Sequence, residues 1–342
     1  MMRALIVHRA GPGVTPQDAG RPGHLASGLS RGGAADRLAL AEGAAILRQD
    51  GASAALEMAG MGGEFEATQD MRIALTGAPM RASIDGARIA WNASHLLPAG
   101  ARLSIGATEA GSYGYLHLGG GIVTPPVLGA RSAHLAAGLG GPVAPGTRLP
   151  IGPDKRPQDI GQLLEVAPRF DGGTIRVVPG PQTGFFSAEE RARFAATTFT
   201  RDTRGNRMGV RLLGDGPGFH SEAGLSVLSE IIAPGDIQIT GDGSPFVLLS
   251  ECQTTGGYPR IGSVLPSDLP RVAQARPGDQ LRCNFVTLEA AVEIERRAAT
   301  HARTLGNRLR PLIRDPHRMH DLLSYQLISG VTAGDDLERG AP

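Results

Sequence analysis

The abundance of glycine and proline constrains the fold of this chain more than any other feature of its sequence. The 342 residues include 49 Gly and 25 Pro, well above ordinary usage. Neither a Gly-X-Y period nor a low-complexity tract accounts for them. Because glycine and proline set the dihedral angles of tight turns, this composition predicts a mainly β fold of many short strands.

A recurring phrase in the sequence supports this prediction. In four places a turn made of proline and glycine runs directly into an alternating apolar segment: residues 98–105, 145–151, 234–239 and 277–282. Proline presets φ at such a turn, and glycine takes the position at which φ is positive. Each phrase therefore predicts a turn that leads into a strand. Two phrases fall in each half of the chain, which hints at two similar β units.

Helices are expected to be few. Residues 34–48 place Ala, Leu and Ile at helical spacing, and residues 287–304 are rich in Ala, Glu and Arg. A capping box at residues 187–190 opens a short helix. Another helix over residues 316–328 gives a helical C-terminal tail. Residues 152–159 combine prolines and charges that bury no apolar surface, and we place a domain boundary there.

Composition excludes several classes of protein. The formal net charge is +1, from 34 basic and 33 acidic residues spread along the chain, so the sequence predicts no binding to nucleic acid or to an anionic membrane. No apolar run reaches the length of a membrane helix, and residues 1–7 fit a first strand better than a signal peptide. Cys252 and Cys283 are far apart and predict buried thiols in a reducing cytoplasm.

The histidines and the glycine-rich segments do not predict a metal or nucleotide site. His317 and His320 are three residues apart, but no nearby pattern completes a metal site. The three glycine-rich segments, residues 60–63, 119–121 and 138–141, lack the G-x-x-x-x-G-K-[ST] frame of a phosphate-binding loop. They are better explained as turns. We expect no metal and no cofactor bound by this chain alone.

The first candidate site is a rigid loop over residues 11–23. It places Gln17, Asp18 and Arg21 among prolines and glycines. Asp18 and Arg21 can form a charge-assisted pair, or Arg21 can bind a ligand carboxylate with its planar guanidinium. The alternative is a surface turn with a solvated salt bridge.

The second candidate site follows a strand in residues 248–261. Gln253, Thr254, Thr255 and Tyr258 offer amide and hydroxyl groups beside a Gly-Gly turn, which lets backbone approach a ligand closely. These groups suit recognition of a cyclic amide or ureido group, because no histidine is adjacent to serve as the base of a nucleophile. A hairpin with satisfied side chains is the alternative, and Cys252 remains open as a nucleophile. No catalytic residue is assigned.

Both stretches also resemble motifs of a known family. The matching segments are, in order, residues 15–21 (Thr-Pro-Gln-Asp-Ala-Gly-Arg), 32–36, 55–57, 74–78, 115–122, 127–132, 176–182, 206–212 and 253–259 (Gln-Thr-Thr-Gly-Gly-Tyr-Pro). On these segments the chain resembles the carboxyltransferase A/B-domain family, whose members include the C-type subunits of 5-oxoprolinases, allophanate hydrolase subunit 2 and Kip-type antagonists. The resemblance covers residues 3–300.

The resemblance implies two cyclophilin-like β-barrel domains, over residues 1–155 and 170–300, and leaves residues 301–342 as a C-terminal extension. It also implies a hetero-oligomer with a B-type subunit, with the active site in the cleft between the two. In one chemistry of the family, 5-oxoproline is converted to glutamate by a complex that uses ATP and also contains an A-type subunit. The other is biotin-dependent: it moves a carboxyl group to urea or another amide from biotin on a separate carrier.

Three functions follow from the resemblance. We expect a C-type subunit of 5-oxoprolinase, because no carrier motif for biotin is present in the chain. The alternatives are a carboxyltransferase subunit and a regulatory protein that binds a sensor-kinase inhibitor. Arg260 stands where many members have lysine, and it cannot act as a base near neutral pH. We further expect the two candidate stretches to converge on one cleft that faces the partner.

Overall fold

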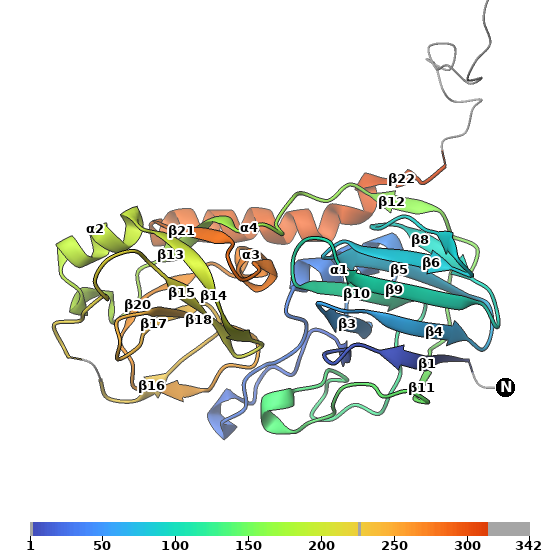
Figure 1. The fold of residues 1–342 in the computed structure, drawn as a ribbon, viewed down its shortest axis with the longest axis horizontal. Helices are drawn as coiled ribbons and strands as arrows, with labels where there is room; N and C mark the ends of the chain where they lie inside the picture. The colour runs from blue at the N-terminus through green and yellow to red at the C-terminus, as the bar shows by residue number, and fades with distance from the viewer. Residues whose placement is uncertain (1–2, 225–226, 314–342) are drawn as a thin grey trace, which may run out of the picture.

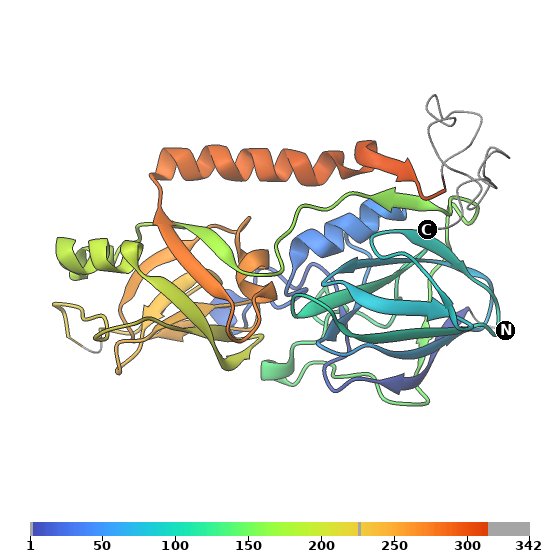
Figure 2. The ribbon, with the colours of Figure 1, turned by 45° about the horizontal axis from the view of Figure 1, so that its top comes forward.

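The computed structural model describes residues 3–224 and 227–313. Figure 1 shows two β units side by side, with a long helix, α4 (Leu288–Thr304), lying along both of them. Figure 2 shows the same helix crossing from one unit to the other. The predicted mainly β fold with few helices is confirmed.

The first unit is built from two sheets. In spatial order, the six-stranded sheet contains β11 (Arg148–Pro150), β1 (Ala4–Ala10), β4 (Gly63–Ala67), β9 (Arg102–Thr108), β6 (Met80–Ile84) and β7 (Ala87–Arg88). The five-stranded sheet contains β2 (Thr15–Gln17), β3 (Ala55–Ala59), β10 (Tyr113–Leu118), β5 (Met71–Gly77) and β8 (Ser94–Leu97). Both sheets contribute apolar side chains to one shared core.

Every residue of β5 and β10 is buried. The reason is that helix α1 (Arg37–Ile46) covers the face of these strands that points away from the shared core. When both faces of a strand are covered, the side chains on both faces are buried, and buried and exposed residues no longer alternate along the strand. These two strands are therefore shielded from solvent on both faces.

The second unit is a closed barrel. Its strands are, around the ring, β13 (Gly173–Val178), β20 (Arg260–Val264), β17 (Asp236–Ile239), β18 (Pro245–Leu248), β15 (Gly209–Leu213), β14 (Thr198–Asn206) and β21 (Gln280–Phe285). Neighbouring strands are antiparallel except β13 and β21, which run parallel. Closure leaves no free sheet edge in the ring, and the inward side chains fill its interior.

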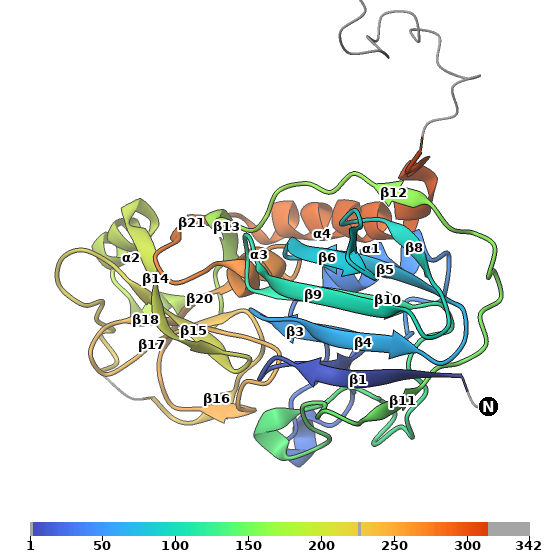
Figure 3. The ribbon, with the colours of Figure 1, turned by 45° about the vertical axis from the view of Figure 1, so that its right-hand side comes forward.

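Four short strands lie outside these assemblies, in two antiparallel pairs. The first pair is β16 (Glu230–Ile231) with β19 (Thr255–Gly256), and the second is β12 (Gln162–Leu164) with β22 (Leu309–Pro311). The second pair returns the chain to the first unit after α4, as Figure 3 shows. The predicted division at residues 155, 170 and 300 stays a prediction.

The turns behind the four predicted strands have the expected geometry. Gly100, Gly146, Gly235 and Gly278 all have positive φ, between 76° and 103°. Each lies shortly before a strand, namely β9, β11, β17 and β21. The prediction that each phrase leads into a strand is thus confirmed. Glycine stands at each of these turns because a residue with a Cβ is disfavoured at positive φ.

Three predicted helices are also confirmed. Helix α1 begins after Asp36, whose carboxylate accepts from the Ala39 amide at 2.9 Å and caps the helix. Ser187 caps α2 (Ala188–Ala196) and Thr287 caps α4 in the same way. The other helical segments are α3 (Leu269–Gln274), η1 (Leu25–Ser27), η2 (Leu135–Ala137), η3 (Thr183–Phe185) and η4 (Leu305–Arg308). The helix expected at residues 316–328 lies outside the described residues.

Residues 152–159, expected as a linker, are mostly exposed but are attached to the first unit. The carboxylate of Asp154 pairs with the buried Arg72 guanidinium at 2.8 Å. A second bond joins Arg72 Nε to the same carboxylate at 2.9 Å. Such a bidentate pair holds one orientation of the segment, so its position is set by the first unit.

Candidate site at the outer wall of the barrel

One face of the barrel carries a largely apolar pocket with a few polar groups, because side chains alternate along its strands. Ile237, Ile239 and Val247 point into the barrel core. Gln238 and Phe246 lie between them in sequence and therefore point outward, opposite each other on neighbouring strands. Alternation thus gives this wall an outer surface that is partly apolar and carries one amide.

The segment that follows β18 folds back over this outer surface. A small apolar cluster of Ile232, Leu248 and Cys252, with Phe246 packed against it, holds the segment in place. The result is a half-open pocket of about 270 Å³. Its lining residues are Asn206, Met208, Gln238, Thr240, Phe246, Leu248, Cys252, Gln253 and Tyr258. Gln253 and Tyr258, two residues of the second predicted site, thus line a real pocket.

The pocket is electrically neutral, since none of these lining residues is acidic or basic. Its polar groups are amides, hydroxyls and a thiol. Burial, and to a smaller extent the nearby Asp236 carboxylate, raise the pKa of the Cys252 thiol to about 12. The thiolate is the nucleophilic form of cysteine. At neutral pH Cys252 is therefore a protonated packing residue, and its possible role as a nucleophile is not supported.

The other two residues of the second predicted site lie beside the pocket. Thr254 is half-buried, and its carbonyl accepts from the Ile232 amide at 3.1 Å. Thr255 is exposed and pairs with Ile231 in the β16–β19 ladder. Both residues therefore support the segment that covers the pocket, and neither lines it.

The residues of the first predicted site are buried at a different place. Asp18 accepts from the Gly20 amide at 2.9 Å and from the Arg131 amide at 2.6 Å. Gln17 donates through Nε2 to the carbonyl of Ala133 at 3.2 Å. These bonds fasten the loop to residues 131–133, so the interpretation as a solvated surface turn is wrong.

Arg21 does not form the ion pair with Asp18 that was considered for it. Its side chain is 1% exposed and donates to the backbone carbonyls of Val127 and Ser132. No ion pair with Asp18 forms, since both oxygens of that carboxylate accept from backbone amides. Its Nη1 is buried and has no hydrogen-bond partner. Burial is also the largest cause that lowers the pKa of the Arg21 guanidinium.

The two predicted stretches approach each other through their neighbours. The Gly32 amide donates to the Ser250 carbonyl at 2.9 Å, which joins the segment that follows the first loop to the start of the second segment. The side chains of the first set lie buried on the side of the first unit, whereas Gln253 and Tyr258 line the pocket on the barrel wall. A single cleft that unites all seven side chains stays a prediction.

A buried charge network lies where the two units meet. Arg207 pairs with Glu57 and Glu251, and it also donates to the Gly33 carbonyl. The Tyr115 hydroxyl donates to Glu57 at 2.6 Å. Ionised groups buried at such a junction must be paired to be tolerated. Our interpretation of the sequence missed this network, although Glu57 and Arg207 lie inside quoted motifs, because partners about 150 residues apart give no local signal.

Two short segments, residues 206–208 and 251–253, each contribute side chains to both the buried charge network and the pocket. Arg207 points into the buried network, whereas its neighbours Asn206 and Met208 line the pocket. Glu251 likewise points into the network, and Cys252 and Gln253 line the pocket. The position of the pocket wall is therefore coupled to the junction between the units.

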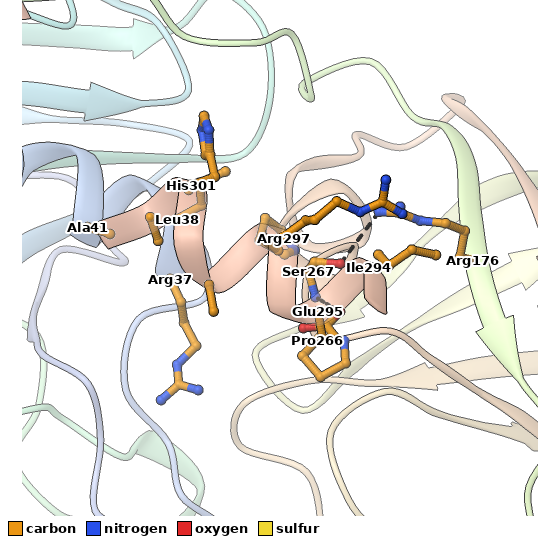
Figure 4. Close-up of a pocket in the computed structure, with 14 residues that line it drawn as sticks. Arg37, Leu38, Ala41, Arg176, Pro266, Ser267, Ile294, Glu295, Arg297 and His301 are labelled. Carbon is orange, nitrogen blue, oxygen red and sulfur yellow. Dashed lines mark hydrogen bonds between the residues drawn. The ribbon is translucent and has the colours of Figure 1, made fainter. Parts of the chain in front are cut away.

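A larger hollow of about 630 Å³ lies under α4, as Figure 4 shows. Arg176 and Arg37 line it from opposite ends. Arg176 is bound to Asp268 at 2.5 Å, and this hydrogen bond raises the pKa of its guanidinium. Glu295 accepts from the Ser267 amide at 3.0 Å. The polar groups of Arg176 and Glu295 are thus already paired. The hollow includes none of the site residues predicted from the sequence.

Potential metal ligands do not cluster in the described part of the chain. Residues 3–224 and 227–313 contain no group of three His, Cys, Asp or Glu side chains that could hold a metal ion. His317 and His320 lie outside these residues. The three glycine-rich segments lead into strands or loops and not into helices, so their interpretation as turns is confirmed. Within the same residues, none of the helices has the length and apolar character needed to cross a membrane.

Comparison with known proteins identifies the family of this chain. The family model described as "Carboxyltransferase domain, subdomain A and B" matches residues 27–285. The chain belongs to this carboxyltransferase family. The C-type subunit of 5-oxoprolinase from Escherichia coli (strain K12) is 35% identical over 300 residues, which are 84% of this chain and 93% of that protein. The corresponding 5-oxoprolinase chain of Haemophilus influenzae is 30% identical over 287 residues.

Other proteins that this chain resembles are longer than the chain. Saccharomyces cerevisiae urea amidolyase is 26% identical over 315 residues, which are 17% of that protein. The solved structure of TTHA0988 has a TM-score of 0.75 and 30% identity, and this chain spans 55% of it. Kluyveromyces lactis urea amidolyase has a TM-score of 0.79 over 92% of this chain at 23% identity, which shows the fold alone. The relatives named by function are enzymes or enzyme subunits.

Proposed function

We propose that this chain is the C-type subunit of an ATP-dependent 5-oxoprolinase and acts with A-type and B-type subunits to convert 5-oxoproline, ATP and water to glutamate. The observation that carries the proposal is the 35% identity to the E. coli 5-oxoprolinase chain across 93% of that protein. The match extends over nearly the whole relative, whereas the matches to urea amidolyases cover a sixth of theirs.

The pocket on the barrel wall supports an amide substrate. It is neutral, about 270 Å³ in volume, and lined by the amides of Asn206, Gln238 and Gln253. Small-molecule sites combine mostly apolar walls with a few placed polar groups, which is the composition seen here. A lactam ring suits the apolar wall, and its amide suits the polar groups. The carboxylate of 5-oxoproline would then lie toward the exposed rim at Tyr258.

Partner subunits would supply what this chain lacks. No ATP site is proposed on the chain, because its glycine-rich segments are turns that lead into strands or loops. The thiol of Cys252 is protonated and offers no nucleophile. We therefore place ATP binding and the reacting groups on the A-type and B-type subunits. The two buried free cysteines support a cytoplasmic location.

Reconstitution tests this proposal. The purified chain alone should release no glutamate from 5-oxoproline and ATP, and activity should appear when the cognate A-type and B-type subunits are added. Omitting each subunit in turn is the matched control. Robust turnover by the lone chain, or a complete complex that is inactive on 5-oxoproline, would overturn the proposal.

Arg21 is a poor choice for probing this activity. Its guanidinium donates to two backbone carbonyls in a buried loop, so its removal affects folding as well as any ligand. Tyr258 is 44% exposed and lines the pocket, so Tyr258→Ala tests the same complex with less effect on stability. Its kcat/KM should fall by about tenfold if the rim holds substrate.

A second function has one observation in its favour. The urea amidolyase of S. cerevisiae is 26% identical in a match that covers 86% of this chain, and a neutral pocket also suits urea. In that case the complex would transfer a carboxyl group from biotin on a separate carrier. Urea-dependent ATP turnover with a biotin carboxylase and carrier, and none with 5-oxoproline, would favour this alternative.

A further inference from the structure

The hollow under α4 is an apolar space between two helices. Ile294, Ala298 and Ala302 are spaced four residues apart on α4, so they share one face of that helix, and all three line the hollow. Leu38 and Ala41 line it from the side of α1. Its volume of about 630 Å³ lies within the range of about 300–1,000 Å³ that is usual for small-molecule sites. The hollow therefore has room for an apolar chain.

One end of the hollow carries two cations that are close together. Arg37 lines this end, and its Nη2 donates to the Ala19 carbonyl at 2.8 Å. The Nε of Arg31 donates to the same carbonyl at 2.9 Å. Among the residues that the structure describes, neither guanidinium forms an ion pair. Two cations are thus held on one oxygen atom without a carboxylate to neutralise them.

The position of Arg37 adds to the positive potential at this end. Arg37 is the first residue of α1, and the N-terminus of a helix carries partial positive charge. The carboxylate of the preceding Asp36 is already paired with Arg169 at 2.9 Å. Loss of hydration, and to a smaller extent the charge of Arg31, lower the pKa of the Arg37 guanidinium to about 10. Arg37 therefore stays a cation at neutral pH, in a place that favours an anion.

The opposite end of the hollow has no such excess of positive charge. Figure 4 shows Arg176 at this end, and its guanidinium is bound to Asp268. Arg297 forms a solvent-exposed pair with Glu293 at 3.6 Å. The hollow is therefore asymmetric, with unneutralised cations at one end and apolar walls along the middle. A ligand that fits it has one anionic end and an apolar body.

We propose that the hollow under α4 binds an amphipathic carboxylate, with its carboxylate on Arg37 and Arg31 and its acyl chain between α1 and α4. Each guanidinium keeps N–H donors that Ala19 does not use, and a guanidinium matches a carboxylate with two parallel hydrogen bonds. Burial of the acyl chain supplies the apolar part of the affinity. This inference concerns a different part of the molecule from the pocket on the barrel wall and does not depend on the proposed function.

The direct test is calorimetric titration of the full chain with octanoate. The control ligands are 1-octanol, which has the same chain without the charge, and acetate, which has the carboxylate without the chain. We expect octanoate to bind about tenfold more tightly than 1-octanol, because it gains charge-assisted hydrogen bonds. It should bind about 100-fold more tightly than acetate, because of the buried chain. Equal affinity for octanoate and 1-octanol, or no binding of octanoate, would overturn the proposal.

Variants of the chain locate the binding. Arg37→Gln should weaken octanoate binding by about tenfold and leave 1-octanol binding unchanged. Ala298→Glu puts a carboxylate into the apolar wall and should weaken octanoate binding by at least as much. Ala290→Glu is the matched control, since Ala290 is exposed on the same helix and does not line the hollow. Wild-type affinity in folded Arg37→Gln and Ala298→Glu chains, checked by their melting temperatures, would contradict the proposal.

Sedimentation of the ligand-free chain tests a different occupant of the hollow, a second copy of this chain. We expect Ala298→Glu to leave the oligomeric state unchanged over the whole range of protein concentrations. A dimer that dissociates on Ala298→Glu and persists on Ala290→Glu would assign the hollow to self-association and overturn the proposal. Octanoate should also raise the melting temperature of the wild-type chain in a concentration-dependent way, and less so that of Arg37→Gln.

Discussion

Arg207, from the barrel, forms a buried ion pair with Glu57, from the first unit. The two residues are 150 positions apart in sequence. The same guanidinium binds Glu251 and the Gly33 carbonyl. Burial disfavours the charged form of Arg207, but the two carboxylates outweigh it and raise the pKa of its guanidinium. The junction between the units therefore contains a buried cation that is paired with one carboxylate from each unit.

Arg207→Ala should strongly destabilise the chain, because it leaves two carboxylates buried without a cation. We expect the free energy of unfolding to fall by about 3–5 kcal/mol, measured by urea denaturation. The matched control is Arg9→Ala, whose pair with Glu64 is exposed to solvent. That change should cost about 0–1 kcal/mol. Equal losses in the two variants would show that the junction charges do not govern stability.

Gly43→Ala should destabilise the protein although alanine is the better helix former. The usual gain is about 1 kcal/mol in a helix interior. Here the added Cβ would lie 2.1 Å from Nε2 of His117, a buried ring that is hydrogen-bonded to Thr76 at 2.8 Å. Overpacking of this kind costs about 1–3 kcal/mol. Gly51→Ala, where nothing lies within 4 Å, is the control and should be nearly neutral.

The stability of the chain should fall in acid partly because of His117. Burial lowers the pKa of this ring from 6.5 to about 3. Between these values the unfolded chain binds a proton that the folded chain does not, so unfolding is favoured as the pH falls below 6.5. The expected slope from this group is about 1.4 kcal/mol per pH unit. His117→Gln should flatten the dependence, and a variant with the wild-type slope would contradict this assignment.

Both cysteines should be inert in the native protein. Burial raises the pKa of the Cys252 and Cys283 thiols to about 12, so almost no thiolate forms at neutral pH. A colorimetric disulfide reagent should react slowly with the folded chain. After denaturation it should react with both thiols. Thr255→Cys places a thiol at an exposed position and should react at once. Rapid labelling of the native chain would show that the pocket wall opens.

The sequence predicted most of the fold because its strongest signals act locally. Proline and glycine restrict φ at single positions, so the four phrases located four strands without knowledge of their partners. Asp36, Ser187 and Thr287 cap helices through amides three residues away. Closure of the second unit into a ring follows instead from pairings such as β13 with β21, which are about 110 residues apart.

The candidate site shows where local signals stop. The sequence by itself determined that polar residues gather in rigid segments near residues 17–21 and 253–258, since turn residues and polar side chains are visible there. Only the tertiary structure decided their roles. It buried Arg21 against carbonyls from residues 127 and 132, and it left Gln253 and Tyr258 at a pocket that Gln238 also lines. Gln238 looks ordinary in sequence. It lines the pocket because strand alternation turns it outward, and a segment about 15 residues further along the chain then folds over it.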